Sequence, residues 1–90
     1  MPQAIVDPED LHRFAVDLKR FGGDVQAQIA GIHRQFAKLG ETWKDQEHAK
    51  FAGEFLHMVS VVSKFVSAAE EQVPVLLRKA EAIRRYLEQG

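Results

Sequence analysis

The segment GETWKDQEHAKF, residues 40–51, decides the fold, because it interrupts a long helical pattern near the middle of the chain and holds the single tryptophan, Trp43. Gly40 stands where a helix commonly ends. After it, a helix can restart in two ways: Thr42 can open a capping box that Asp45 completes, or Asp45 can itself be the cap. Both predict a tight connection, so the flanking helices fold into an antiparallel hairpin.

The first helix is predicted over residues 8–40. Asp7 can cap its exposed N–H groups, Pro8 fits the first helical position, and the two acidic residues that follow suit the positive end of the helix. Two apolar stripes run along this helix. One recurs every seven residues: Leu11, Leu18, Val25, Ile32 and Leu39. The other begins with Phe14 and Phe21 and then shifts by one position to Ile29, Phe36 and Trp43.

That shift, a stutter in the heptad pattern, falls at Gly22 and Gly23. Two glycines inside a helix cost about 1 kcal/mol each relative to alanine. A tolerated kink would account for them, and so would a close approach of the second helix. The sequence leaves both explanations open.

The second helix is predicted over residues 45–88, with the turn at 40–45 and the whole chain, 1–90, as one domain. Its main stripe alternates steps of three and four residues, as in a coiled coil: Ala52, Phe55, Val59, Val62, Val66, Ala69, Val73, Leu76, Ala80, Ile83 and Leu87. Phe51, Met58 and Phe65 form a row beside it. Pro74 lies off the stripe, so we expect a kink there in a helix that continues.

The apolar stripe of the second helix is wider than one partner helix can cover. We therefore predict an all-α antiparallel helical hairpin that dimerises into a four-helix bundle. The predicted dimer interface contains Phe51, Phe55, Met58, Val62 and Phe65. Phe51, Phe55, Met58 and Phe65 would each forfeit about 1.5–3 kcal/mol if left fully exposed. The partner can be a second copy or a related hairpin, and the stripe accepts either.

The composition excludes several classes of protein. Twelve basic and thirteen acidic residues nearly cancel, which argues against nucleic-acid binding. No stretch approaches the roughly 20 apolar residues of a membrane span. The first ten residues lack the basic and apolar regions of a secretory signal peptide, so any export must proceed without a cleaved signal.

No catalytic or metal-binding constellation is found, and we expect neither enzymatic activity nor a cofactor. Glu9 and His12 have the Glu-x-x-His spacing of di-iron bundles, as do Glu54 and His57. Neither histidine lies on an apolar stripe, and a hairpin would separate the two pairs by about 25 Å along its axis. The other two histidines, His33 and His48, are expected at solvated helix positions.

The length, the hairpin and the tryptophan in the turn resemble the WXG (Trp-x-Gly) family of small early-secreted-antigen-like proteins handled by type VII secretion systems. Trp43 matches the motif, and Phe51 matches an aromatic residue eight positions later. Asp45 replaces the family glycine, so here the turn must be built by side-chain capping. The resemblance implies a secretion substrate or secretion partner, and a secretion ATPase as one binding partner.

The resemblance also implies a docking role for the hairpin ends. Tyr86 begins a segment similar to the family export signal, Tyr-x-x-x-Asp/Glu, but Gly90 stands where the acid should be. In an antiparallel dimer of the family type, Trp43 would lie near the end of the partner's second helix, with Asp45 and Tyr86 as further docking residues. Alternatively, Trp43 only closes the apolar stripe of the first helix. A cytoplasmic helical adaptor with no export role is the alternative function.

Overall fold

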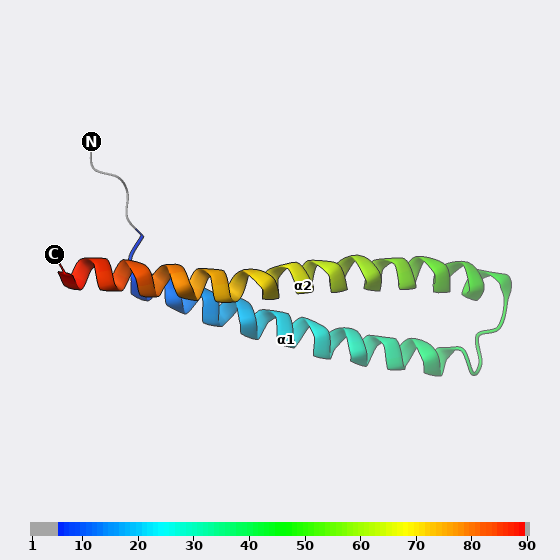
Figure 1. The fold of residues 1–90 in the computed structure, drawn as a ribbon. Coiled ribbons are helices and arrows are strands. Elements are labelled where there is room, and N and C mark those ends of the chain that lie inside the picture. The colour runs from blue at the N-terminus through cyan, green and yellow to red at the C-terminus, as the bar shows by residue number, and fades with distance from the viewer. Residues whose placement is uncertain (1–5, 90) are drawn as a thin grey trace.

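The computed structural model describes residues 6–89 and consists of two long helices joined by a short turn (Figure 1). Helix α1 spans Pro8–Leu39 and helix α2 spans Gln46–Gln89. The described residues contain no strand, and the molecule is a rod of 68 × 23 × 15 Å. The predicted all-α antiparallel hairpin is confirmed. The helix limits lie within one residue of those expected, and Gly90 lies outside the described residues.

Helix α1 begins as its first residues predict. Asp7 has extended backbone angles, φ −66° and ψ 122°, and its Oδ1 accepts a hydrogen bond of 2.8 Å from the backbone N–H of Glu9. Pro8 is the first helical residue. Its missing N–H would have had no partner within the helix, so this position tolerates proline at no cost.

The turn is built by side-chain capping. Asp45 is the N-cap of α2, because its Oδ1 accepts a hydrogen bond of 3.0 Å from the backbone N–H of His48. Thr42 makes no capping box; its hydroxyl donates instead to the carbonyl of Leu39, at 3.5 Å. Gly40 ends α1 with φ −63° and ψ −15°, angles that any residue adopts. A Cβ there would lie 3.3 Å from the Ala37 carbonyl oxygen, so a larger residue would require a shift of a few tenths of an ångström.

The predicted stutter in α1 is wrong. The inward line runs unbroken at steps of seven through Ala15, Gly22, Ile29, Phe36 and Trp43. Ala15 and Gly22 are buried, whereas Phe14 and Phe21 are 57% and 49% exposed. A Cβ on Gly22 would lie 3.4 Å from Cγ1 of Val66. The glycines were explained either by a kink or by a close approach of the second helix. The close approach holds at Gly22, and α1 runs through both glycines without interruption.

Helix α2 packs on α1 through the stripe predicted for it. The buried residues of α2 are Phe55, Val66, Val73 and Ala80. Pro74 is exposed, and the helix continues past it to Gln89. Two polar contacts link the helices: Gln26 Nε2 donates to Glu70 Oε1 at 3.1 Å, and Arg84 Nη2 contacts Glu9 Oε1 at 2.6 Å.

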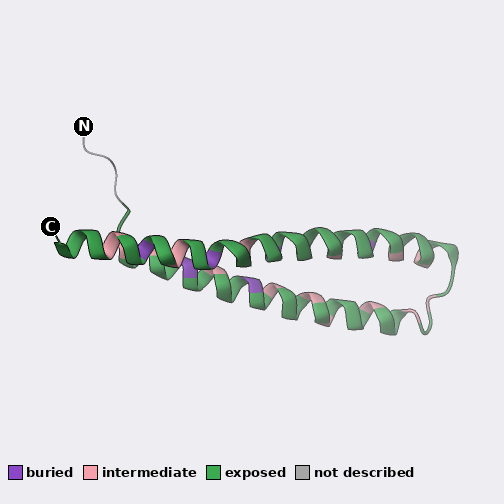
Figure 2. Cartoon of the chain, in the orientation of Figure 1, coloured by how far each residue is buried: buried purple, intermediate pink, exposed green. Residues whose placement is uncertain are grey.

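The interior between the helices is thin. Figure 2 shows that buried residues occupy a few places along the line of contact, while most of both helices is exposed. The buried apolar residues of the described chain are Ala15, Phe55, Val66, Val73 and Ala80. Four of these are alanine or valine, and toward the open end of the hairpin larger apolar side chains such as Leu18 and Leu76 are only half-buried.

Candidate interaction face and turn cluster

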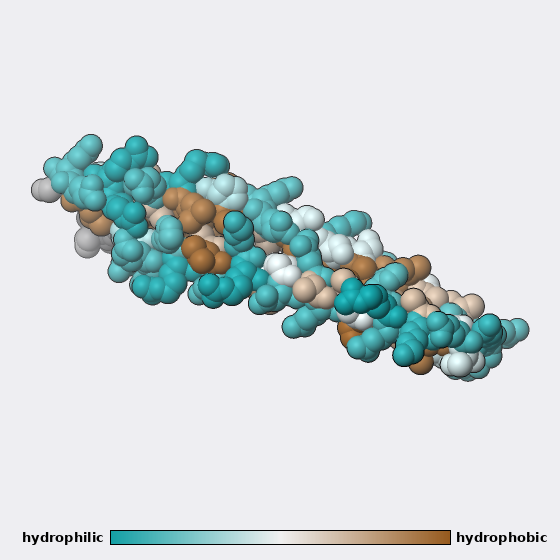
Figure 3. All heavy atoms as spheres, turned by 90° about the horizontal axis from the view of Figure 1, so that it is seen from below, coloured by the Kyte–Doolittle hydropathy of each residue, from teal (hydrophilic) through white to brown (hydrophobic). Residues whose placement is uncertain are grey.

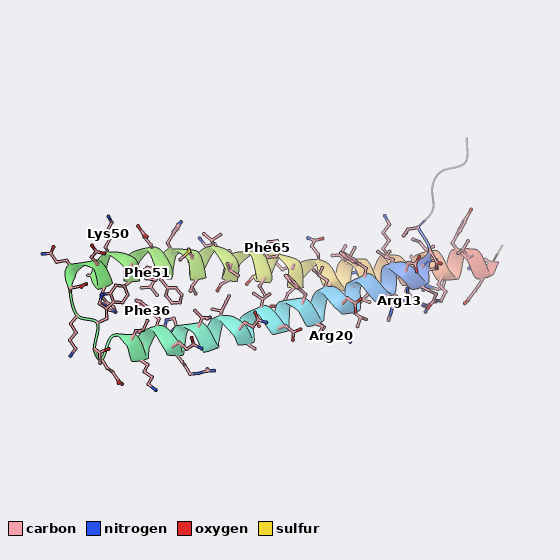
Figure 4. All side chains as sticks on the ribbon, turned by 180° about the vertical axis from the view of Figure 1, so that it is seen from behind. Arg13, Arg20, Phe36, Lys50, Phe51 and Phe65 are labelled. Carbon is pink, nitrogen blue, oxygen red and sulfur yellow. The ribbon has the colours of Figure 1, made fainter. Side chains whose placement is uncertain are left out.

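Five aromatic rings pack together where the chain turns. This turn cluster contains Phe36, Trp43, His48, Phe51 and Phe55. Its centre is Phe36, whose ring centroid lies 4.9 Å from that of Phe55 and 5.6 Å from that of Phe51. Figure 4 shows Phe36 and Phe51 between the two helices, with Lys50 directed away from α1. The cluster therefore joins the helices at the turn, whereas small residues join them at the open end.

Trp43 closes the cluster at its outer end. It is half-buried, its ring meets that of His48 edge-on at 5.1 Å, and its centroid lies 6.1 Å from that of Phe51. Its backbone N–H also donates to the Leu39 carbonyl at 2.8 Å. Trp43 thus extends the inward line of α1 and has a clear structural role, and its partial exposure leaves part of the indole available to another molecule.

The expectation that His48 occupies a solvated position is wrong. Its imidazole stacks on Phe36 with ring centroids 5.0 Å apart and planes only 7° from parallel. Its Nε2 is buried and has no hydrogen-bond partner among the described residues. The cause is the Asp45 cap, which places His48 in the first turn of α2 with its side chain over the turn. His33 is exposed, as expected, beside the ring of Phe55 at 6.0 Å.

Of the five residues predicted for a dimer interface, the structure leaves four accessible. Phe51, Met58, Val62 and Phe65 are exposed, and Phe65 reaches 58%. Phe55 differs, because it is only 8% exposed and packs within the hairpin. A partner could therefore cover Phe51, Met58, Val62 and Phe65 fully, but it could bury little more of Phe55.

These accessible side chains share one face of the hairpin with residues of α1. A groove of about 280 Å³ runs between the helices on this face, lined by Val25, Gln28, Ile29, Ile32, Phe55, Met58, Val59 and Val62. In an antiparallel pair, the positions of Phe14 and Phe21 on α1 and of Phe51, Met58 and Phe65 on α2 flank the same side. We call this side the apolar face. Figure 3 shows apolar side chains gathered in patches along the rod between polar flanks.

The groove is a concave surface, and it is apolar. Its lining includes one polar side chain, Gln28, and no ionisable one. The opposite side of the hairpin carries the polar contact between Gln26 and Glu70. Phe14 and Phe21 were not predicted on the apolar face, because their size suggested an inward position. The small residues Ala15 and Gly22, one position later at the same spacing, indicate that the inward line runs through them instead.

The exposed area is large for a chain of this mass. The accessible surface is 7227 Å², whereas a compact monomer of 10.2 kDa is expected to expose about 5,300 Å². Part of the excess follows from the rod shape. Large apolar side chains of this face are exposed, Phe14, Phe21 and Phe65 among them, and a contiguous exposed apolar surface is the usual sign of a protein-binding site.

The three predicted docking residues do not meet within one chain. Trp43 and Asp45 lie at the turn, whereas Tyr86, 68% exposed, lies near the far end of α2 (Figure 1). A rod 68 Å long separates the two ends. Any surface that combines them therefore needs two chains.

Within residues 6–89, no three histidine or acidic side chains converge in a way that could hold a metal ion. His12 and His57 are both exposed, on different helices. Neither helix contains, in its described residues, a stretch long and apolar enough to cross a membrane.

Comparison with known proteins gives one clear likeness. The sequence matches no family model and no curated protein. It is similar to solved structures of EsxB, a secreted protein from Bacillus anthracis strain Sterne. A selenomethionine-labelled form has 28% sequence identity and a TM-score of 0.79, over 96% of this chain and 98% of that chain.

Two further EsxB structures agree. A variant with proline replaced by alanine has 28% identity and a TM-score of 0.82, over 94% of this chain and 96% of that chain. A wild-type crystal form has 28% identity and a TM-score of 0.78, over 93% and 97%. EsxB is a WXG-family protein, and the resemblance to that family, predicted from the tryptophan in the turn, is confirmed.

Proposed function

From the likeness to the WXG family, we propose that this hairpin is a secreted, non-enzymatic protein that acts as a substrate or secretion partner of a type VII secretion system. The observation that carries the proposal is the similarity to secreted EsxB over 96% of the chain. Function then depends on protein–protein contact. The apolar groove supports this reading, because its lining offers no pair of ionisable side chains for acid–base chemistry.

The apolar face supports a partner of the same kind as the chain itself. A second hairpin laid on this face would complete a four-helix bundle and cover the side chains that the first hairpin leaves exposed. Burying Phe65, Met58 and Phe51, which are already partly covered, contributes up to about 1.5–3 kcal/mol each. That gain is large beside the usual stability of a small domain, about 5–15 kcal/mol.

The turn supports the second part of the proposal, recognition by the secretion machinery. Trp43 is partly exposed at one end of the rod and is held in place by His48 and Phe51. Asp45 fixes the first turn of α2 beside it. We assign this end, together with Tyr86 from a partner chain, as the surface that a secretion ATPase binds.

An export assay tests the proposal. The chain is expressed in a bacterium that carries a type VII system, with and without its membrane-bound ATPase, and the culture supernatant is analysed. The proposed export does not involve cleavage, so we expect ATPase-dependent appearance of the chain at the same mass as inside the cell. Equal amounts in the supernatant without the ATPase would contradict the proposal, and a chain retained in the cytoplasm in both strains would favour the adaptor function.

Variants of the turn separate docking from folding. Trp43→Ala removes packing on His48 and Phe51 and should lower the melting temperature of the purified protein moderately, but it is expected to reduce export more strongly, several-fold. Trp43→Phe should retain more export, because a ring still packs on His48. Glu41→Ala, an exposed residue of the same turn, is the matched control. A large loss of melting temperature in Trp43→Ala with export intact would assign Trp43 a purely structural role.

A further inference from the structure

The side of the hairpin opposite the apolar face also holds a groove between the helices. One hollow of about 390 Å³ is lined by Gln26, Ile29, Ala30, His33, Arg34 and Ser63. A second hollow, of about 270 Å³, lies between Lys19 of α1 and Glu70 of α2. Because Gln26 donates a hydrogen bond of 3.1 Å to Glu70, the two hollows adjoin. We call them together the back groove. A hairpin laid on the apolar face leaves it open.

The centre of the back groove is walled by small residues. Gly23 and Ala30 of α1 and Ser63 of α2 are all exposed there. Among residues 6–89, no atom lies within 4 Å of the position that a Cβ on Gly23 would take. A glycine inside a helix costs about 1 kcal/mol relative to alanine, and the hairpin makes no use of the space. Small residues allow a further helix to pack at an axial distance of about 8–10 Å.

Two unpaired cations flank this small centre. Neither Lys19 nor Arg34 forms an ion pair within residues 6–89, whereas the other two arginines of α1 are each paired with an aspartate. Along α1 the two cations lie about two heptads, or about 22 Å, apart. Between them stands the carboxylate of Glu70, which repels a second carboxylate. The back groove therefore favours an acid at each end and a neutral hydrogen-bond donor in the middle.

The chain itself does not carry this charge pattern. Three aspartates of α1 follow one another at steps of seven: Asp10, Asp17 and Asp24. If the outer two met the cations of another copy's back groove, Asp17 would face Glu70, and like charges in contact repel. Helix α2 has no two acidic residues at that spacing. A nucleic-acid strand, with a charge on every phosphate, meets the same repulsion at Glu70.

We propose that the back groove binds an acidic amphipathic helix of another protein. Two of its carboxylates, about two heptads apart, pair with Lys19 and Arg34. A neutral amide between them donates to Glu70, and apolar side chains of the helix pack over Gly23 and Ala30. This surface lies opposite the apolar face, so the rod binds one partner on each side. The proposal does not depend on export.

A designed peptide tests the proposal. The probe is a labelled helical peptide of about four heptads with capped ends, long enough to hold its helix in water. It carries leucine along one face, glutamate at two positions two heptads apart, and glutamine midway between them. Fluorescence anisotropy against the full chain measures its Kd. Replacing both glutamates by glutamine, or the middle glutamine by glutamate, should raise the Kd about fivefold.

Variants of the chain locate the contact. Arg34→Glu should raise the Kd of the acidic peptide about fivefold, and lysine in place of the facing glutamate of the peptide should restore it. Lys38→Glu, the same change at an exposed position of α1 outside the back groove, is the control and should leave the Kd within about twofold.

Glycine variants test the close approach. Gly23→Leu fills the space that the bound helix occupies and should raise the Kd more than about tenfold. Gly53→Leu, at an exposed glycine of α2 that also has nothing within 4 Å, is the matched control and should leave the Kd unchanged. Melting curves followed by circular dichroism show that both variants are folded.

Four results would overturn the proposal. These are equal affinity for the peptide without glutamates, equal effects of Gly23→Leu and Gly53→Leu, no rescue of Arg34→Glu by the lysine peptide, and equally tight binding of a single-stranded oligonucleotide of the same net charge. Native mass spectrometry of the variants gives a fifth. If Gly23→Leu changed the oligomeric state of the chain, the occupant of the back groove would be another copy of the chain and the proposal would be wrong.

Discussion

The two adjacent glycines of α1 give the sharpest test of how the helices face each other. Gly22 lies on the inward line, where an added Cβ would meet Cγ1 of Val66 at 3.4 Å; at Gly23 nothing lies within 4 Å. Gly23→Ala should therefore stabilise the hairpin by about 1 kcal/mol, through helix propensity and a less flexible unfolded chain. Gly22→Ala should gain less, because its methyl group would lie 3.4 Å from Cγ1 of Val66, at the tight limit of van der Waals contact.

A larger side chain separates the two positions. Gly22→Leu should cost about 1–3 kcal/mol, because its branched carbons must enter the space of Val66, which is fully buried. Gly23→Leu extends into solvent and should be at least neutral. For a domain of this size, 1 kcal/mol corresponds to about 4–8 °C in melting temperature.

Thermal unfolding followed by circular dichroism, with all variants at one protein concentration, measures these differences. Equal stability of Gly22→Leu and Gly23→Leu would refute the close approach of α2 at Gly22. The inward line through Ala15 and Gly22 would then be wrong, and with it the assignment of Phe14 and Phe21 to the apolar face.

Substitutions at three further positions test the turn and the interior. Asp45→Ala removes the cap of α2 and should destabilise the hairpin by about 1 kcal/mol, measured by urea unfolding. Asp45→Asn keeps an accepting oxygen and should cost much less. Equal losses would show that the hydrogen bond from the His48 N–H contributes nothing to stability. Phe55→Ala should destabilise the hairpin by about 3–5 kcal/mol, because its ring is buried against Phe36. Phe65→Ala should weaken self-association with little effect on the stability of the isolated hairpin. A larger loss of hairpin stability in Phe65→Ala than in Phe55→Ala would show that the other side of α2 faces the interior.

Much of the fold could be predicted because its determinants are local. Asp7 and Pro8 mark the start of α1, and Asp45 marks the start of α2; each acts through backbone groups two or three residues away. The inward stripe of α2 is regular and mostly apolar, so its periodicity alone predicts which side of α2 packs on α1. The resemblance carried by Trp43 depended on the same local features.

The orientation of α1 could not be predicted in the same way, because it depends on the distance between the helices. Large apolar side chains suggest an inward position, and the periodicity therefore predicts one for Phe14 and Phe21. The close approach at Gly22 leaves room only for small residues, and it becomes visible only once Val66 is placed opposite. His48 was misplaced for a related reason, since the cap at Asp45 and the ring of Phe36 together determine where its imidazole lies.

The thin interior has a thermodynamic consequence. Among residues 6–89, the hairpin encloses five apolar side chains, and a domain of this size with so small a core has little stability of its own. A molecule that binds only the folded rod adds stability by mass action, about 2.7 kcal/mol at a hundredfold excess over its Kd. With the proposed second hairpin as that molecule, folding and assembly would form one linked equilibrium, in which dilution alone would melt the helices and the unfolding midpoint would rise with the concentration of the chain.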